Sequence, residues 1–446
     1  MKKIVINGPS KLEGSVKLQG DKNASMRHVL LPMLVNDKFT FHNIPNIGSI
    51  QNLLQIMKRQ GVKYRWFDKN SLEIDSRNVK KIKTLKRDLF YYTSGSVSLI
   101  PILASRFGKC IVEKNIEDNN YGGCKIGSRT FQQIIDSSKD LGIDCKETEK
   151  EYTFSIVSNA PFICNVPVSS YTVTVNAVYA ALFRKGESRI VNFTKEPIFE
   201  DVLTAIISTG ADIEVRNKEL IIKGGKKLGR IDYNNVSDRH EFATWVSAGL
   251  STNSNLLING VDYERMKLKQ LEKVIKSMNI DLEFENNCCK IIPQLKKIQP
   301  TTIEAGRYPD FQTEWQVVFS PLLTQVGGKS RVVELLYPDR MAHWKEMKKM
   351  GIKSKLSQSI KSPLFAPADE KERITPNVVE ITGPQSLYGA KVPANDVRAG
   401  AALIIAGLLA KGKTEITGID QIERGYEDIV ERLQKLGVDI RYVSER

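Results

Sequence analysis

Ser138-Lys139-Asp140-Leu141-Gly142-Ile143-Asp144 follows a pattern that returns five more times along the chain. In each copy an amphipathic helix ends, usually at a small residue, and a short β-branched strand follows. The other copies cover residues 56–64, 207–213, 276–282, 348–353 and 434–440. Their spacing of roughly 70 to 85 residues is far longer than that of a solenoid repeat. Each copy therefore marks a small α/β module.

A mostly apolar helix lies between successive copies and leads through a turn into another strand. Helices that are apolar on most sides belong inside a core rather than on its surface. The expected helices cover residues 24–34, 96–107, 172–183, 241–250, 313–323 and 396–409. Six modules, each with one buried helix, one amphipathic helix and a few short strands, predict an α/β fold whose helices are enclosed by sheets.

The six modules divide into two globular halves of three. We expect one domain of residues 1–20 plus 230–446 and another of residues 21–229, because the last module can lie beside the start of the chain. The chain would cross between them near residues 17–22 and 226–233, both rich in Gly, Lys and polar residues. Two halves joined by such a double linker form a cleft that can close on a ligand.

The composition favours a cytoplasmic globular protein. With 446 residues, 41% of them hydrophobic and 26% charged, the chain is expected to fold into two or three domains. No apolar run reaches the length of a membrane span, and no signal peptide is visible at the start. The six cysteines lack paired CxxC spacing, so we expect reduced thiols and no structural metal or disulfide framework.

The formal net charge of +15 suggests an acidic partner. Much of the excess is lysine scattered on helical faces, without a basic tail or an aromatic-interleaved RNA motif. Solvated faces explain this distribution. The charge permits a nucleic-acid binder but gives no argument for one.

Residues Tyr121-Gly122-Gly123-Cys124-Lys125-Ile126-Gly127-Ser128-Arg129 combine a thiol, two cations and three glycines. Glycines let the backbone approach a ligand closely, and the cations would hold an anion and lower the pKa of Cys124. The segment suits a lid over a phosphate. The alternative is a surface turn that happens to contain a cysteine.

Further polar residues stand where expected buried helices begin. Lys22 at a helix N-terminus suits a phosphate or carboxylate, although Asn23 or Ser25 could simply cap that helix. His240 could act as a base or belong to a capped helix start. Glu314, close to Asp310, could serve as a general base or as an ordinary helix-start carboxylate.

Arg398 and Arg424 are each expected in the first turn of a helix, where an arginine is unfavourable for the helix dipole. Two such arginines suggest anion binding, since the fork of Arg matches carboxylate and phosphate oxygens. Surface salt bridges to Asp396 and Glu427 are the alternative.

Together these segments resemble the enolpyruvyl transferases, especially the UDP-N-acetylglucosamine branch that serves peptidoglycan synthesis and is the target of fosfomycin. The resemblance covers nearly the whole chain, and the cysteine loop separates it from the shikimate-pathway branch. It rests on Lys22-Asn23, Gly122-Gly123-Cys124 with Ile126-Gly127 and Arg129, Asp238-Arg239, Asp396 with Arg398, and Arg424-Gly425-Tyr426. The family's fold is two inside-out α/β barrel domains of three repeated units each, in agreement with the six modules.

The resemblance also implies roles. Phosphoenolpyruvate would be bound by Lys22, Arg129, Arg398 and Arg424, with Lys22 and Arg424 also taking part in catalysis. Cys124 would protonate the methylene carbon or take up phosphoenolpyruvate covalently, and Glu314 would stand where the family has its catalytic aspartate. Acceptor contacts would come from Asn23, Ser169, Ser170, Phe131 and Glu314.

Several positions depart from the family pattern, mostly on the acceptor side. Ser94 replaces a family arginine, and residues 130–134 lack the Pro, Asp and His typical of the uracil-binding segment. Ser169-Ser170-Tyr171 differs from the small turn expected near the nucleotide. The donor side is kept, so the identity of the acceptor is left open.

The expected activity is therefore enolpyruvyl transfer from phosphoenolpyruvate to a hydroxyl of a nucleotide-type acceptor, by default UDP-N-acetylglucosamine. The alternatives are the same chemistry on another nucleotide, such as UMP, and a catalytically silent paralogue that binds a nucleotide sugar. The resemblance implies no cofactor and no metal. We expect small-molecule substrates, no nucleic-acid or membrane partner, and a monomer or weak homo-oligomer.

Overall fold

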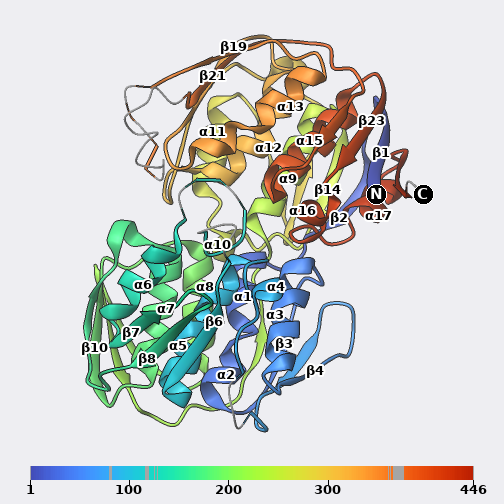
Figure 1. Cartoon of the computed structure of the whole chain (residues 1–446). Helices are drawn as coiled ribbons and strands as arrows, with labels where there is room; N and C mark the ends of the chain where they lie inside the picture. Colours follow the sequence, from blue (N-terminus) through green and yellow to red (C-terminus); the bar gives the residue numbers. More distant parts are fainter. Residues whose placement is uncertain are drawn as a thin grey trace. The chain divides into compact units, whose positions relative to one another are not determined.

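The computed structural model describes residues 2–79, 83–115, 120–124, 126–127, 129–359, 361, 363–364 and 376–444. Lys125 and Ser128 of the glycine-rich segment lie outside these residues. The chain divides into two compact units (Figure 1), unit 1 with Met1–Gln19, Cys124–Ser128 and Ser237–Arg446, and unit 2 with Gly20–Gly123 and Arg129–Val236. Cys124 thus belongs to unit 1, although the sequence placed its loop in the other half.

Unit 1 contains three sheets among its described residues. The first has the order β22 (Lys391–Pro393), β23 (Gly412–Thr417), β1 (Lys2–Gly8), β24 (Ile440–Ser444). The second has the order β15 (Glu283–Glu285), β16 (Cys288–Ile291), β14 (Asn255–Asn259), β2 (Glu13–Lys17). The third has the order β18 (Phe311–Gln312), β17 (Thr302–Gly306), β19 (Gly328–Glu334), β21 (Val378–Gly383), β20 (Ser354–Ser357).

The described part of unit 2 also contains three sheets. The first has the order β11 (Asp212–Arg216), β12 (Glu219–Gly224), β10 (Gly186–Val191), β9 (Ile163–Asn165). The second has the order β13 (Asp232–Asn234), β3 (Lys38–His42), β5 (Leu72–Asp75), β4 (Lys63–Trp66). The third has the order β6 (Lys109–Glu113), β8 (Glu151–Ile156), β7 (Ile143–Glu147). All six sheets mix short strands with helical connections, which confirms the expected α/β class.

Buried helices fill the space between the sheets of each unit. In unit 1 these are α9 (Arg239–Ser251), α12 (Thr313–Leu323) and α15 (Val397–Leu409), and α12 packs against both of the others. Every residue of α9 is buried. In unit 2 the corresponding helices are α1 (Lys22–His28), α2 (Leu31–Val35), α5 (Leu99–Phe107) and α7 (Tyr171–Leu182). The prediction of helices enclosed by sheets is confirmed.

One expected helix is broken. The sequence predicted a single helix over residues 24–34, but α1 ends at His28 and α2 begins at Leu31. Pro32 is in the first turn of α2, where its missing N–H costs nothing, whereas inside a continuous helix it would remove a hydrogen bond and clash with the preceding turn.

The amphipathic helices occur where the repeat predicted them, and each is followed by a strand. They are α3 (Gly48–Arg59), α6 (Phe131–Lys139), α8 (Pro197–Ser208), α11 (Lys269–Ser277), α13 (His343–Lys349) and α17 (Ile429–Lys435). The small residue after each helix has a positive φ: Gly61, Gly142, Gly210, Asn279, Gly351 and Gly437. Only glycine, and to a lesser degree asparagine, adopts this left-handed conformation cheaply, so the repeated residue is the one that ends the helix.

The remaining helices are short. They are α4 (Arg87–Phe90), α10 (Tyr263–Met266) and α16 (Ile419–Glu423), with 3-10 turns η1 (Ser94–Ser98), η2 (Pro167–Ser169), η3 (Leu295–Lys297) and η4 (Pro338–Met341). None of the described helices is both long and apolar enough to cross a membrane.

The start of the chain is built into unit 1. Strand β1 pairs antiparallel with β23 and β24, so that Ile4 lies opposite both Ile416 and Tyr442. Strand β2 pairs in parallel with β14. The last module therefore lies beside the first residues, as the sequence predicted.

Candidate active site

Two buried helices of unit 1 begin with a capping aspartate that fixes the residues after it. Asp238 accepts hydrogen bonds from the backbone N–H groups of His240 (2.8 Å) and Glu241 (3.0 Å). Asp396 does the same for Arg398 (2.7 Å) and Ala399 (3.0 Å). Caps of this kind satisfy N–H groups that have no partner within the helix. His240 and Arg398 are consequently held in the first turns of α9 and α15.

Arg398 is a buried cation, with 4% of its side chain exposed. Its Nη2 lies 3.9 Å from Asp238 Oδ1, and its guanidinium lies 5.0 Å from the centre of the Tyr426 ring. Burial lowers the pKa of Arg398, but the interactions with Tyr426 and Asp238 outweigh it and raise the pKa. Nη1 is buried and has no hydrogen-bond partner among the described residues. The side chain therefore has a donor left for an anion.

Arg424 contacts the cysteine of the glycine-rich segment. Its Nη2 donates to Cys124 Sγ across 3.1 Å, although the residues are 300 positions apart in the chain. A neighbouring guanidinium favours the thiolate, the reactive form of cysteine. The prediction that Arg424 lies in the first turn of a helix is wrong, because it directly follows the last residue of α16. There a cation is favourable for the helix dipole.

Gln19 holds the turn that carries Arg424. Its Nε2 donates to the carbonyl of Gly425 (2.9 Å), and its Oε1 accepts from the N–H of Glu427 (2.8 Å). Arg424 is 6% exposed. The alternative of surface salt bridges is therefore wrong for both arginines, since Arg398 is buried as well.

Glu314 forms an ion pair with an arginine that the sequence analysis did not find. Arg340 Nη2 lies 2.8 Å from Glu314 Oε1. Burial raises the pKa of Glu314, but Arg340, His240 and Arg398 outweigh it and lower the pKa to about 2. A carboxylate with so low a pKa is ionised at neutral pH and takes up a proton weakly. The geometry therefore favours a role in orienting Arg340 over the expected role of general base.

Arg340 is positioned by a buried carboxylate. Glu334, at the end of β19, accepts from the backbone N–H groups of Leu336 (2.8 Å) and Tyr337 (3.0 Å) and so orders the turn that leads to η4. Arg340 itself is buried, and its Nε has no hydrogen-bond partner among the described residues. The available signal was an arginine in the polar turn Pro338-Asp339-Arg340, which follows the apolar strand β19 after Leu335-Leu336-Tyr337.

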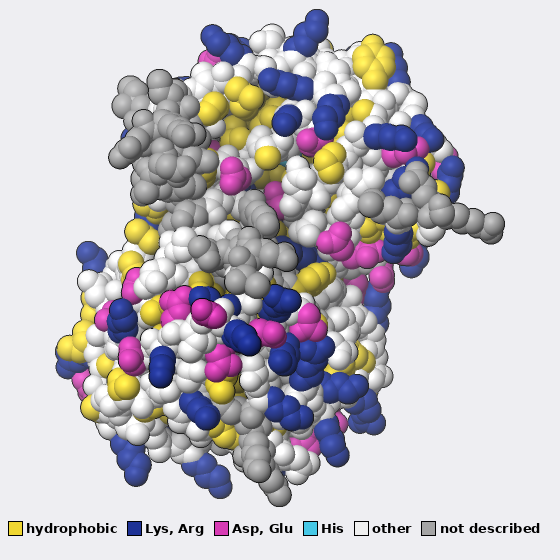
Figure 2. All heavy atoms as spheres, in the orientation of Figure 1, with side chains coloured by type: hydrophobic (Ala, Val, Ile, Leu, Met, Phe, Trp, Pro, Cys, Tyr) yellow, Lys and Arg dark blue, Asp and Glu magenta, His cyan; other side chains and the backbone are white. Residues whose placement is uncertain are grey.

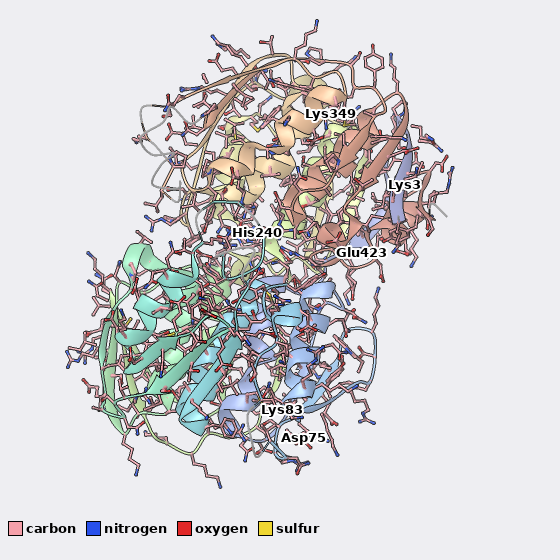
Figure 3. The ribbon with its side chains drawn as sticks, in the orientation of Figure 1. Lys3, Asp75, Lys83, His240, Lys349 and Glu423 are labelled. Carbon is pink, nitrogen blue, oxygen red and sulfur yellow. The ribbon has the colours of Figure 1, made fainter. Side chains whose placement is uncertain are left out.

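His240 is neutral in this environment. Burial lowers its pKa to about 3, and its ring lies 6.1 Å from the ring of Trp315. Figure 3 shows it on α9 of unit 1. A histidine with this pKa does not titrate near neutral pH, so the alternative of a capped helix start describes His240 better than that of a base.

Lys22 and Asn23 begin α1 of unit 2. The preceding Asp21 caps the helix through a hydrogen bond from the N–H of Ala24 (2.8 Å). The hydroxyl of Tyr171 donates to the carbonyl of Asn23 (3.3 Å). The cap is therefore Asp21, and neither Asn23 nor Ser25 caps this helix.

The glycines of the Cys124 segment are required by their surroundings. Gly122 has a φ of 103°, and a Cβ there would lie 2.8 Å from the carbonyl oxygen of Tyr91. Gly123 packs on Ser94, with 3.2 Å between the position of its missing Cβ and Ser94 Cβ. Ser94 thus supports the backbone just before the cysteine.

Arg129 follows the segment on the unit 2 side. Its guanidinium lies 5.7 Å from the centre of the Tyr121 ring, and the N–H of Tyr121 donates to its carbonyl (3.0 Å). The ends of the segment are thereby tied together, and the cation is held against an aromatic face.

Arg27 is a second arginine that the sequence analysis missed. It lies one helical turn after Asn23 and is only 1% exposed. Its Nε and Nη1 have no hydrogen-bond partners among the described residues, and its guanidinium lies 5.4 Å from the centre of the Tyr171 ring. A buried cation without a carboxylate is costly unless an anion completes it. The signal was an arginine within the mostly apolar stretch of residues 24–34.

Three expected acceptor contacts have structural partners instead. Phe131 is 3% exposed and stacks on Tyr152 with 4.3 Å between ring centres. Its ring therefore belongs to the core of unit 2, which corrects the expectation that it faces the acceptor. Ser169 donates to Asn192 Oδ1 (2.9 Å). Ser170 caps α7 by accepting from the N–H of Val173 (3.4 Å).

The described residues contain no group of three His, Cys, Asp or Glu side chains arranged to hold a metal ion. The six cysteines are free thiols.

Comparison with known proteins gives one consistent match. Residues 6–433 match the family described as EPSP synthase (3-phosphoshikimate 1-carboxyvinyltransferase). The chain is 30% identical to a UDP-N-acetylglucosamine 1-carboxyvinyltransferase of Streptococcus pneumoniae, with 100% of both chains covered. It is also 30% identical to the enzyme of that name from Pelodictyon phaeoclathratiforme, covering 99% of this chain and 98% of the relative.

Solved structures with the same fold include the enolpyruvyl transferase NikO from Streptomyces tendae. It superposes with a TM-score of 0.85 at 20% identity over 100% of this chain and 99% of that one. EPSP synthase from Acinetobacter baumannii gives a TM-score of 0.70 at 15% identity, with both chains fully covered. At these identities the likeness concerns the fold alone.

Proposed function

Because this chain belongs to the EPSP synthase family of enolpyruvyl transferases, we propose that it transfers the enolpyruvyl group of phosphoenolpyruvate to a hydroxyl of a nucleotide-type acceptor. UDP-N-acetylglucosamine is the default acceptor, supported by the printed name of the relatives at 30% identity. The observation that carries the proposal is the contact between Arg424 and the Cys124 thiol in a unit that also holds the buried Arg398 and Arg340.

The reaction consists of an addition and an elimination. The acceptor oxygen bonds to C2 of phosphoenolpyruvate and loses its proton, while C3 gains a proton and becomes a methyl group. In the resulting ketal the C2–O bond to the phosphate then breaks, C3 loses a proton, and an enol ether and inorganic phosphate are left. The donor carries an ionised carboxylate and a phosphate throughout, and negative charge builds up on the phosphate as the C2–O bond breaks, so fixed cations hold the donor and stabilise the elimination.

The chain contains side chains suited to this chemistry. We assign Cys124 to proton transfer at C3, and Arg398, Arg424 and Arg340 to the anionic groups of the donor. Lys22 and Arg129 keep the donor-binding roles that the resemblance gives them. Glu314 holds Arg340 through Oε1, and we assign its other oxygen to a hydrogen bond from the acceptor hydroxyl.

The acceptor is proposed to carry an anionic group that reaches Arg27. The unpartnered donors of this buried guanidinium support such a group. Both the diphosphate of a nucleotide sugar and the phosphate of a mononucleotide meet this requirement. A second candidate is therefore the same transfer to another nucleotide, such as UMP, which the altered segment at residues 130–134 favours.

The test is to incubate the protein with phosphoenolpyruvate and a panel of nucleotides and UDP-sugars, and to measure phosphate release. Release with UDP-N-acetylglucosamine is expected. Release with UMP alone would replace the default acceptor, and tight binding without release from any member would indicate a catalytically silent protein.

The role of Arg27 is tested separately. Arg27→Leu is expected to raise the KM for the acceptor at least about tenfold, since a charged hydrogen bond contributes about 1.5–3 kcal/mol, and to leave the KM for phosphoenolpyruvate nearly unchanged. An equal rise in both would contradict the assignment. Arg106→Leu, which removes a partly buried arginine bound to the carbonyl of Met33, is the matched control for lost packing in the same unit.

A further inference from the structure

The third sheet of unit 1 has one apolar face and one charged face. Successive side chains of a strand point to opposite faces. Val332 of β19 and Val379 and Ile381 of β21 are fully buried. The residues between them, Arg331, Glu380 and Thr382, are partly or fully exposed.

Strand pairing arranges the charges of this face in rows. Arg331 lies opposite Glu380, and Glu380 lies opposite Lys355. Lys329 lies opposite Thr382 in the neighbouring row. Residues that are directly opposite share one face. Glu304 of β17 lies opposite Val333 and is exposed, so the solvent side of the sheet carries three cations and two carboxylates.

Most of this positive charge is not neutralised. Glu380 pairs with Lys329 at 3.0 Å, and the hydrogen bond with Lys329 lowers the pKa of Glu380. Lys348, Lys353 and Lys355 form no ion pair with a carboxylate of the described residues. By contrast, the neighbouring Lys349 is paired with Glu346 at 2.6 Å.

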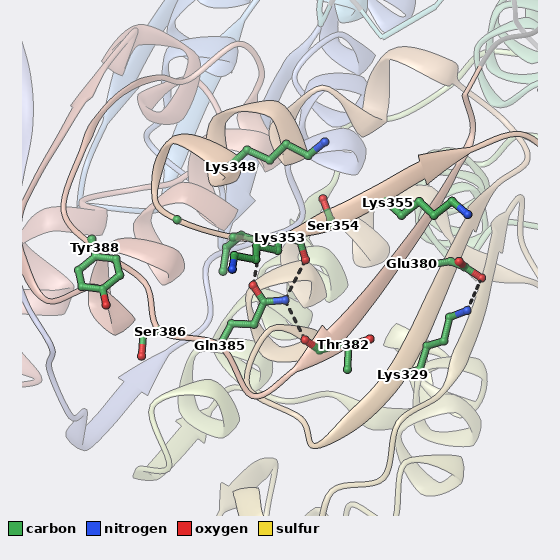
Figure 4. Close-up of a pocket in the computed structure, with 12 residues that line it drawn as sticks. Lys329, Lys348, Lys353, Ser354, Lys355, Glu380, Thr382, Gln385, Ser386 and Tyr388 are labelled. Carbon is green, nitrogen blue, oxygen red and sulfur yellow. Dashed lines mark hydrogen bonds and ion pairs between the residues drawn. The ribbon is translucent and has the colours of Figure 1, made fainter.

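A groove with a volume of about 1120 Å³ is lined by Lys329, Lys348, Lys353 and Lys355. Figure 4 shows Tyr388 at one end, Lys353 and Gln385 in the middle, and Lys329 with Glu380 at the other end. Figure 2 shows lysine and arginine side chains over the part of unit 1 where Figure 1 has α13.

The floor of the groove is held in place by Gln385. Its Oε1 accepts from the N–H of Lys353 (2.7 Å), and its Nε2 donates to the carbonyls of Lys353 and Thr382 (both 2.8 Å). The groove is therefore a fixed surface whose charged donors are ammonium groups.

Tyr388 supplies an aromatic platform. It is 54% exposed, and it packs against the turn after α13, where a Cβ on Gly351 would lie 3.0 Å from Tyr388 Cδ2. An exposed ring beside a cationic groove suits a base that stacks while phosphates follow the lysines.

We propose that this groove binds single-stranded nucleic acid, with Lys348, Lys353 and Lys355 contacting phosphates and Tyr388 stacking on a base. The open, elongated form of the groove fits a chain of regularly spaced charges better than one compact anion.

The test uses the full chain, saturated with phosphoenolpyruvate and UDP-N-acetylglucosamine, and a fluorescein-labelled oligothymidylate whose anisotropy is followed at increasing salt. Three phosphate contacts predict a slope of about −2 for log K against log salt concentration, and so about a 20-fold loss of affinity between about 50 and 200 mM salt. Tyr388→Leu is expected to weaken binding at least about fivefold at every salt concentration.

The decisive variant is Lys348→Gln with Lys353→Gln and Lys355→Gln. It is expected to remove most of the salt dependence, whereas the charge-matched Lys269→Gln, Lys296→Gln, Lys297→Gln variant, altered at exposed lysines of the same unit, keeps it. Thermal melting followed by circular dichroism checks that both variants are folded. Equal effects of the two triple variants would overturn the proposal.

Two further outcomes would also overturn it. If polyglutamate displaces the oligonucleotide from the wild-type protein as effectively as unlabelled oligothymidylate does, the groove is a site for acidic protein. If Tyr388→Leu binds as tightly as wild type, the ring does not stack on a base.

Discussion

Replacing Arg340 with methionine isolates the ion pair at the candidate active site. The change keeps most of the side-chain volume and removes the charge that faces Glu314 across 2.8 Å. The carboxylate, whose side chain is 23% exposed, then remains without its partner near His240, whose pKa of about 3 keeps it neutral. We expect the loss of this partner to destabilise unit 1.

The size of the effect follows from the pKa of Glu314. It is about 2 in the folded protein against an ordinary value of 4.5, and a shift of that size corresponds to about 3 kcal/mol of stability. Removing one partner of a buried pair costs about 3–5 kcal/mol. We therefore expect Arg340→Met to lower the free energy of unfolding by about 3 kcal/mol at pH 7.

The effect has a defined pH dependence. Since the folded pKa lies below the unfolded one, the stabilisation is complete above about pH 4.5 and is lost as the pH falls toward 2. The difference between wild type and variant should therefore shrink over this range. Glu314→Gln in the Arg340→Met background should restore most of the loss, because no buried charge is left unpaired.

Urea denaturation followed by tryptophan fluorescence reports on the unfolding of unit 1, which contains the Arg340–Glu314 ion pair. Trp245, Trp315 and Trp344 are buried in unit 1, which holds three of the four tryptophans. Arg441→Met, which removes only the exposed pair with Asp439, is the control and should change stability little. The reasoning is refuted if Arg340→Met costs no more than this control, or if its cost is the same at pH 3 and pH 7.

Three further predictions concern single side chains. Cys124→Ser should abolish alkylation by fosfomycin-type epoxides, as judged by the mass of the peptide that contains residue 124. Labelling of that peptide in the variant would show that the thiol is not the alkylated group. Arg424→Ala should raise the KM for phosphoenolpyruvate far more than that for the acceptor and slow the alkylation of Cys124, whereas equal KM changes in steady-state assays would count against its role. Burial lowers the pKa of His343 to about 4, so His343 stays neutral in the folded protein while the same residue of the unfolded chain gains a proton below about pH 6.5. The free energy of unfolding should therefore fall by on the order of 3 kcal/mol between about pH 6.5 and pH 4. In His343→Gln that slope should flatten, and an unchanged slope in denaturation titrations would assign it to other groups.

Much of the fold was predictable because it repeats. The residue that ends each amphipathic helix needs a left-handed conformation, and glycine stands at five of those six positions. A helix-ending pattern that recurs six times predicts the fold far more strongly than a single amphipathic helix does. The break between α1 and α2 was missed because the apolar pattern runs on through Pro32, and only the proline marks the boundary.

Candidate site residues could be proposed from the sequence where a residue stands in an unusual context. Cys124 among glycines and cations is such a case, and so is Arg398 behind its capping aspartate. Arg340 and Arg27 were missed because burial makes them unusual, and burial arises from packing that a linear pattern does not contain. Phe131 was misjudged for the converse reason, since its aromatic neighbours Phe90, Tyr152 and Phe154 come from separate elements.

The central claim concerns which bond of phosphoenolpyruvate breaks. The measurement is to place a heavy-oxygen label in the oxygen that joins C2 to phosphorus, run the reaction with the best acceptor of the panel, and determine by mass spectrometry where the label ends. Enolpyruvyl transfer breaks the C2–O bond, so the account predicts the label in inorganic phosphate and an acceptor that has gained a carboxyvinyl group. Label retained in pyruvate, with the acceptor unchanged or phosphorylated, would contradict it.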